Sequence, residues 1–87
     1  MENIAIIGTG LIGRAWAMVF ARAGHPVRLY DQMPEAAAKA LGLIRDALME
    51  SRSFGLIDEH PDTVVARISV APSLEDAVGT ADYVQEN

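Results

Sequence analysis

The sequence contains no cysteine and few basic residues. Its 87 residues include 7 Lys and Arg against 12 Asp and Glu, so the net charge is −5 at pH 7. Without cysteine, disulfides, thiolate metal sites and cysteine nucleophiles are excluded, and the composition fits a reducing compartment. Binding to nucleic acid requires a basic face that displaces counterions. We therefore expect no nucleic-acid partner.

Long apolar runs and targeting signals are also missing. The apolar stretch Ala15–Ala21 is flanked by Arg14 and Arg22 and is far too short to cross a bilayer. The N-terminus carries Glu2 and lacks the basic region of a secretory signal peptide. We therefore expect a cytoplasmic protein with no membrane partner.

The chain is organised around a glycine motif that follows an apolar run. Residues 4–7, Ile-Ala-Ile-Ile, predict a buried strand, and the glycines after it have the spacing G-x-G-x-x-G. In such a turn Gly8 lets the chain leave the strand, Gly10 lets a pyrophosphate approach the backbone, and Gly13 lets a helix pack closely. Glycine-rich turns are common, so the motif alone also fits a helix start without a ligand.

The residues after the glycine turn predict a helix. From Arg14 to Ala23 apolar residues recur at helical spacing, and Gly24 with the Pro that follows soon after it ends the pattern. Backbone N–H groups near Leu11 and Ile12 would lack partners at the start of this helix, where the helix dipole is positive. We expect them to hold the pyrophosphate of a dinucleotide.

A second strand, Val27–Tyr30, ends at Asp31. In a dinucleotide-binding unit, an acid about 20 residues after the glycine turn hydrogen-bonds the adenosine ribose. A carboxylate accepts hydrogen bonds from both ribose hydroxyls but repels the 2′-phosphate of NADP. Residues 32–34 add no base beside it, and Arg28 lies inside the strand. We expect NAD rather than NADP, although FAD uses a similar turn and the motif does not exclude it.

Helices and strands alternate along the rest of the chain. We expect a helix from Pro34 to about Arg52, a short helix over about 62–66, a strand over 67–70, a brief helix between Ser73 and Gly79, and a strand over 81–85. The predicted fold is α/β, a Rossmann-type doubly wound parallel sheet truncated to about four strands in the order 3-2-1-4. A complete domain of this kind needs about twice this length. Residues 1–87 are therefore expected to be the N-terminal part of a dinucleotide-binding domain.

Polar residues also occur at the end of the fourth strand and in the loop before the short helix. In the order 3-2-1-4 the ligand crevice lies between the glycine turn and the end of the fourth strand, which makes Glu86 a candidate contact for the second ribose. The sequence fits equally well with Glu86 being an exposed acid that has no role in binding. Asp58, Glu59, His60 and Asp62 cluster in the sequence, but acids there favour the dipole of the next helix, and we expect no metal site.

The glycine motif and its surroundings resemble a known family. Residues 8–18, Gly-Thr-Gly-Leu-Ile-Gly-Arg-Ala-Trp-Ala-Met, together with Leu29-Tyr30-Asp31, resemble the N-terminal NAD-binding domain of the 3-hydroxyacyl-CoA dehydrogenase family. The sequence of this motif is most similar to that of the lambda-crystallin branch, which includes L-gulonate 3-dehydrogenase. The segment Ala81–Glu86 is similar to the fourth strand of that branch. The resemblance covers essentially the whole chain, and its glycine motif is the specific part.

The resemblance implies an activity for the parent protein. It implies oxidation of the 3-hydroxy group of a hydroxy acid or acyl-CoA by hydride transfer to NAD, and a place in fatty acid metabolism. It also places Asp31 on the adenosine ribose and the Leu11–Ile12 backbone on the pyrophosphate. Family members use a His–Glu pair, with a Ser and an Asn nearby, that follows the fourth strand. We therefore expect no catalytic residue in this chain, and a helical C-terminal domain outside it that forms a homodimer.

Two other interpretations stay open. The related beta-hydroxyacid dehydrogenases share the glycine motif, and residues beyond Asn87 would separate the two groups. The chain can also be a structural or interaction module that keeps the fold without catalysis, as lens crystallins derived from enzymes illustrate. Affinity for NADH would distinguish such a module. We expect Trp16 and Phe20 in the core or a domain interface, and the open edge of the fourth strand favours self-association.

Overall fold

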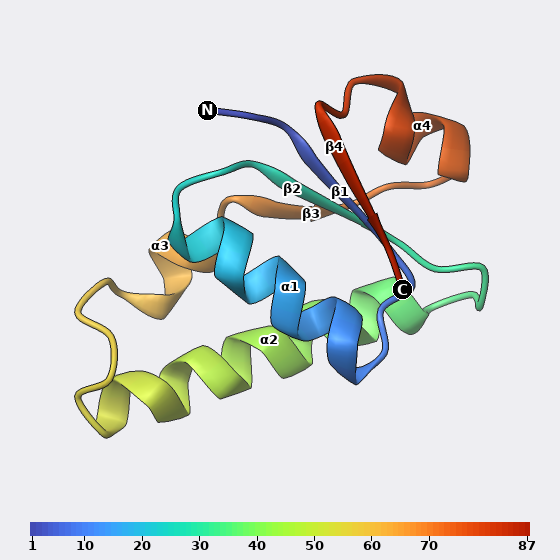
Figure 1. Ribbon diagram of the computed structural model, residues 1–87. Helices are drawn as coiled ribbons and strands as arrows, with labels where there is room; N and C mark the ends of the chain where they lie inside the picture. The colour runs from blue at the N-terminus through green and yellow to red at the C-terminus, as the bar shows by residue number, and fades with distance from the viewer.

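Strand β1 (Ile4–Ile7) lies inside a parallel sheet, because its apolar residues leave no side for solvent. The computed structural model describes all residues, 1–87. The sheet has four strands in the order β3-β2-β1-β4, as predicted. The other strands are β2 (Val27–Tyr30), β3 (Ile68–Val70) and β4 (Tyr83–Glu86), and every pairing is parallel. Figure 1 shows β1 and β2 in the middle of this sheet.

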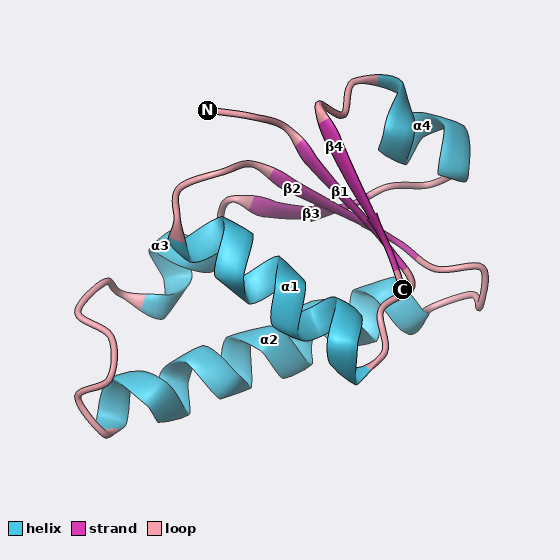
Figure 2. Cartoon of the chain, viewed as in Figure 1, coloured by secondary structure: helices cyan, strands magenta, loops and turns pink.

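Helices cover both faces of the sheet (Figure 2). The helices are α1 (Leu11–Arg22), α2 (Ala36–Ser53), α3 (Pro61–Val65) and α4 (Leu74–Gly79). The first three lie on one face and α4 lies on the other (Figure 1). Right-handed crossovers explain the division, because the chain runs from β1 to β3 in one direction and returns to β4 in the other. None of these helices combines the length and apolarity needed to cross a membrane.

The core lies between the sheet and the layer of α1, α2 and α3. Alternate residues of the strands point into it, as the pleat requires. Small residues on α1 let that helix approach the sheet, since Ala17 and Ala21 are fully buried. The core cluster comprises Ile4, Ile6, Ala17, Ala21, Val27, Leu29, Ala37, Ala40, Ile44, Leu48, Ile57, Val64 and Ile68.

Two helices begin elsewhere than the sequence indicated. Helix α1 starts at Leu11, three residues before Arg14, because Gly10 serves as its N-cap in an extended conformation. Helix α2 starts at Ala36 rather than Pro34, because Glu35 has a φ of 71°, which a right-handed helix does not permit. The other predicted elements were found to within about two residues, the usual uncertainty of helix and strand ends.

The polar cluster of residues 58–62 is divided among separate partners. Glu59 accepts two hydrogen bonds from the guanidinium of Arg67, at 2.8 and 2.5 Å. Asp62 accepts one from Arg45 at 2.9 Å, and the ring of His60 caps α3 by accepting from the backbone N–H of Asp62. No group of three or more His, Asp or Glu side chains has a metal-binding arrangement.

Strand β4 forms an open edge, since it pairs only with β1. Tyr83 and Val84 are 46% and 42% exposed there. Trp16 stacks on Phe20, and Phe20 contacts the ring of Tyr83, with centroid separations of 5.8 and 5.6 Å. Phe20 packs against the core, whereas Trp16 remains 41% exposed beside the edge strand. An aromatic row therefore joins α1 to the open edge.

Candidate functional site

The glycine turn begins where β1 ends. Gly8 has a φ of +90°, a conformation that L side chains rarely adopt. Its backbone N–H donates to the carbonyl of Tyr30 at 2.8 Å, so the turn starts while still attached to β2. A glycine at this position is required by backbone conformation, as the sequence predicted.

Gly13 is required by packing. A Cβ atom at Gly13 would lie 1.9 Å from the carbonyl oxygen of Gly8 and 3.0 Å from Nδ2 of Asn87. The first of these atoms belongs to backbone and cannot give way. The start of α1 therefore packs directly on the glycine turn and on the end of β4, which Figure 1 shows beside it.

Gly10 faces open space. A Cβ atom there would meet no atom within 4 Å, so neither packing nor backbone strain requires this glycine. Its carbonyl accepts the first hydrogen bond of α1, from Arg14 at 2.9 Å. The N–H groups of the three residues between them have no partner inside the helix, and no side chain caps them. An anion can approach these donors over Gly10.

Two adjoining hollows lie at the carboxyl ends of the strands. The first has a volume of about 420 Å³ and is lined by the turn residues 8–13, Asp31 and Asn87. The second, of about 410 Å³, shares Gly8, Asp31 and Asn87 with the first and extends to Glu86. The structure thus brings every residue of the predicted cofactor set to one crevice. Glu86 is exposed and forms the far wall.

Asp31 is held rigidly between the two hollows. Its Oδ2 accepts hydrogen bonds from the backbone N–H and the hydroxyl of Thr9, at 2.8 and 2.9 Å. Its Oδ1 accepts one from the backbone N–H of Met33 at 2.9 Å. The N–H groups of Met33 and Thr9 lower the pKa of the Asp31 carboxyl, although partial burial opposes them. The group is therefore ionised at neutral pH.

Sequence reasoning missed two residues of the site. Thr9 is 4% exposed and bonds Asp31, but its role depends on the pairing of β1 with β2. Asn87 donates from its side-chain amide to the carbonyls of Ile7 and Gly8, at 3.1 and 3.2 Å, and so ties β4 to the turn. A hydroxyl between two motif glycines was the only available signal for Thr9. The strand order placed Asn87 at the crevice, but no pattern in the sequence indicated its hydrogen bonds to the turn.

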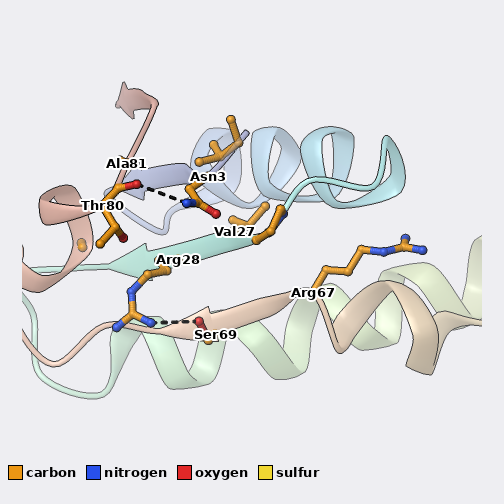
Figure 3. A pocket seen from close by; sticks show the side chains of 10 residues that line it. Asn3, Val27, Arg28, Arg67, Ser69, Thr80 and Ala81 are labelled. Atoms are coloured by element: carbon orange, nitrogen blue, oxygen red, sulfur yellow. Dashed lines mark hydrogen bonds between the residues drawn. The ribbon is translucent and has the colours of Figure 1, made fainter. Parts of the chain in front are cut away.

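Arg28 lies away from Asp31, at the opposite end of the sheet. Its guanidinium pairs with Asp76 of α4. It also donates to the hydroxyl of Ser69 at 3.4 Å (Figure 3). The cavity in that view, of about 220 Å³, lies at the amino ends of the strands, opposite the glycine turn. No base lines either hollow beside Asp31. This arrangement supports the choice of NAD over NADP.

Comparisons with known proteins agree with this geometry. Residues 3–87 match the family described as 3-hydroxyacyl-CoA dehydrogenase, NAD binding domain. An L-carnitine dehydrogenase of Streptomyces griseus is 34% identical over 100% of this chain and 25% of its own length. A lambda-crystallin homolog of Bos taurus is 36% identical over 97% of this chain and 27% of its own.

A solved structure gives the same fold. The 3-hydroxybutyryl-CoA dehydrogenase of Escherichia coli superposes with a TM-score of 0.87 and 31% identity, over 98% of this chain and 18% of that one. The chain spans about a quarter of the length of the two relatives described above.

Proposed function

This chain belongs to the family of 3-hydroxyacyl-CoA dehydrogenase NAD-binding domains, and we propose that it is the cofactor-binding part of a hydride-transferring enzyme. The observation that carries the proposal is the meeting of free helix donors, the open space over Gly10 and the ionised Asp31 in one crevice. NAD, when bound, accepts a hydride from the alcohol that is oxidised.

Each wall of the crevice has a separate task. The N–H groups of Leu11, Ile12 and Gly13 bind the pyrophosphate, because their dipoles and the start of α1 attract an anion. The carboxylate of Asp31 accepts a hydrogen bond from the adenosine ribose and repels a 2′-phosphate. Glu86, on the far wall, is proposed to contact the second ribose.

The proposed activity of the parent protein is oxidation of a 3-hydroxy acid or a 3-hydroxyacyl-CoA. It is supported by the family and by relatives named for L-carnitine and for 3-hydroxybutyryl-CoA. The two histidines are engaged elsewhere, since His25 accepts from the N–H of Glu2 and His60 caps α3. We propose that the catalytic residues and a helical domain that forms a homodimer belong to the rest of the parent protein. A role in fatty acid metabolism and a cytoplasmic location stay predictions.

A second candidate function is a binding module without turnover. The match to a lambda-crystallin homolog favours it, because crystallins derived from enzymes illustrate that such a fold can serve without catalysis. Loss of NADH binding by a folded chain would favour the structural role, whereas retained binding favours the cofactor-binding part of an enzyme.

The test is a parallel titration of the chain with NADH and NADPH, followed by nicotinamide fluorescence. We expect NADH to bind more tightly, and Asp31→Ala to remove that preference. Asp46→Ala is the matched control, because Asp46 is an exposed acid on α2 and its removal changes the net charge equally. Equal affinity for both cofactors in the wild type would contradict the assignment of Asp31.

A further inference from the structure

Thr9 uses all of its polar groups inside the glycine turn. Its backbone N–H and its hydroxyl both donate to Oδ2 of Asp31, at 2.8 and 2.9 Å. Its carbonyl accepts a hydrogen bond from the guanidinium of Arg14 at 3.3 Å. At 4% exposure Thr9 presents almost no surface to a ligand. Although Thr9 lines the first hollow, its polar groups are all engaged, so an effect of its hydroxyl on a ligand there passes through Asp31.

The hydrogen bonds to Asp31 leave it one free acceptor position. A carboxylate offers about four lone-pair positions, two on each oxygen. Thr9 takes both positions on Oδ2, and the N–H of Met33 takes one on Oδ1. The remaining position is on Oδ1. While Thr9 stays bonded, a ribose diol can therefore donate to Asp31 through one hydroxyl only, and not through both, as the sequence alone led us to expect.

We propose that Thr9 is a positioning and specificity-determining residue, whose hydroxyl orients the Asp31 carboxylate so that Oδ1 meets one ribose hydroxyl and excludes a 2′-phosphate. The inference rests on the proposed function, since it requires a ribose at Asp31. Without the hydroxyl, Oδ2 keeps only the backbone donor, and the carboxylate can rotate about its terminal torsion. A carboxylate that turns away binds the ribose less well and also repels a phosphate less.

The test begins with two substitutions of Thr9. Thr9→Val keeps the size and branching of the side chain but removes its hydroxyl, whereas Thr9→Ser keeps the hydroxyl. Because a hydrogen bond to a charged group is among the stronger ones, we expect Thr9→Val to weaken NADH binding roughly fivefold. NADPH binding should fall less, so the preference between the cofactors narrows. Thr9→Ser should keep most of the wild-type affinity for NADH and most of the preference for NADH over NADPH.

A double-mutant cycle separates positioning from general structural damage. If Thr9 acts through Asp31, then Thr9→Val should change NADH affinity little when Asp31 is already alanine. The same loss in both backgrounds would overturn the proposal, because it would mean that the turn itself is damaged. Urea unfolding of each variant checks the fold, and Thr9→Ala provides a second hydroxyl-free variant if Thr9→Val does not fold.

These measurements distinguish failure of the proposed function from failure of the role of Thr9. A folded wild-type chain that binds no NADH removes the proposed function, and the role of Thr9 with it. Wild-type binding that depends on Asp31 but is unchanged, in affinity and in cofactor preference, by Thr9→Val overturns only the role of Thr9.

Discussion

The Cβ position of Gly13 lies 1.9 Å from the carbonyl oxygen of Gly8. The backbone at the start of α1 therefore packs against the backbone at the end of β1, with no space for a side chain at residue 13. The same turn leaves the Cβ position of Gly10 without a neighbour within 4 Å. Two glycines of one motif are thus required for different reasons, one by packing and one by space for a ligand, and the difference can be measured.

Gly13→Ala should destabilise the fold. The added methyl group forces α1 away from the turn, and overpacking of this kind costs about 1–3 kcal/mol. Gly42→Ala is the matched control, because Gly42 lies in α2 with open space at its Cβ position. That control should stabilise the chain by about 0.5–1 kcal/mol through helix propensity. Urea unfolding measures both, and equal midpoints for the two variants would refute the packing argument.

Gly10→Ala should affect binding rather than folding. The backbone at Gly10 has a φ of −69° and a ψ of −167°, which alanine adopts without strain. The unfolding midpoint should therefore stay close to that of the wild type. The methyl group would occupy the approach to the helix donors, so affinity for NADH should fall about tenfold or more, a loss of at least about 1.4 kcal/mol. An unchanged affinity would mean that the pyrophosphate binds elsewhere.

The stability of the chain should depend on pH through Asp31. The folded state lowers the pKa of this carboxyl, chiefly through the N–H groups of Met33 and Thr9. The stabilisation is therefore fully present above the pKa of the unfolded chain, near the ordinary value of 3.8, and is lost as the pH falls through the lower pKa of the folded state. Asp31→Asn should flatten the pH dependence of unfolding below about pH 5. Urea unfolding in steps from neutral to acidic pH measures the free energy of unfolding of both proteins.

Other carboxyls contribute to the same acid transition. Arg67 lowers the pKa of Glu59, and Arg45 lowers the pKa of Asp62, in each case first by a hydrogen bond. Both act in the same direction as Asp31, so the wild type and Asp31→Asn should both lose stability in acid. Only the difference between their curves reports on Asp31, and coincident curves would contradict the prediction.

The open edge of β4 should make the isolated chain self-associate. The outer edge of β4 has no partner strand, so it presents free backbone N–H and C=O groups to other chains. Val84 exposes 42% of its surface on this strand. Val84→Lys should suppress association, since a lysine at an edge opposes pairing by another chain. Sedimentation velocity over a range of concentrations would measure it. A wild-type chain that stays monomeric at all concentrations would contradict this prediction.

Much of the fold could be predicted because the relevant signals are local. The apolar run at β1, the glycine spacing and the serine at residue 73 each act over a few residues, and the hydroxyl of Ser73 caps α4 as expected. Strand order followed from the handedness of crossovers. The start of α2 was wrong because the left-handed Glu35 depends on how the chain leaves β2, and no residue type marks it.

The candidate site was predictable to a smaller extent. The sequence alone determined the strand, the glycine turn and Asp31, because their types and spacing express local backbone chemistry. Only the tertiary structure decided that Thr9 bonds Asp31 and that Asn87 bonds the turn. Those contacts join residues 22 and 79 or more positions apart, and they exist only because parallel pairing brings the ends of β2 and β4 to the end of β1.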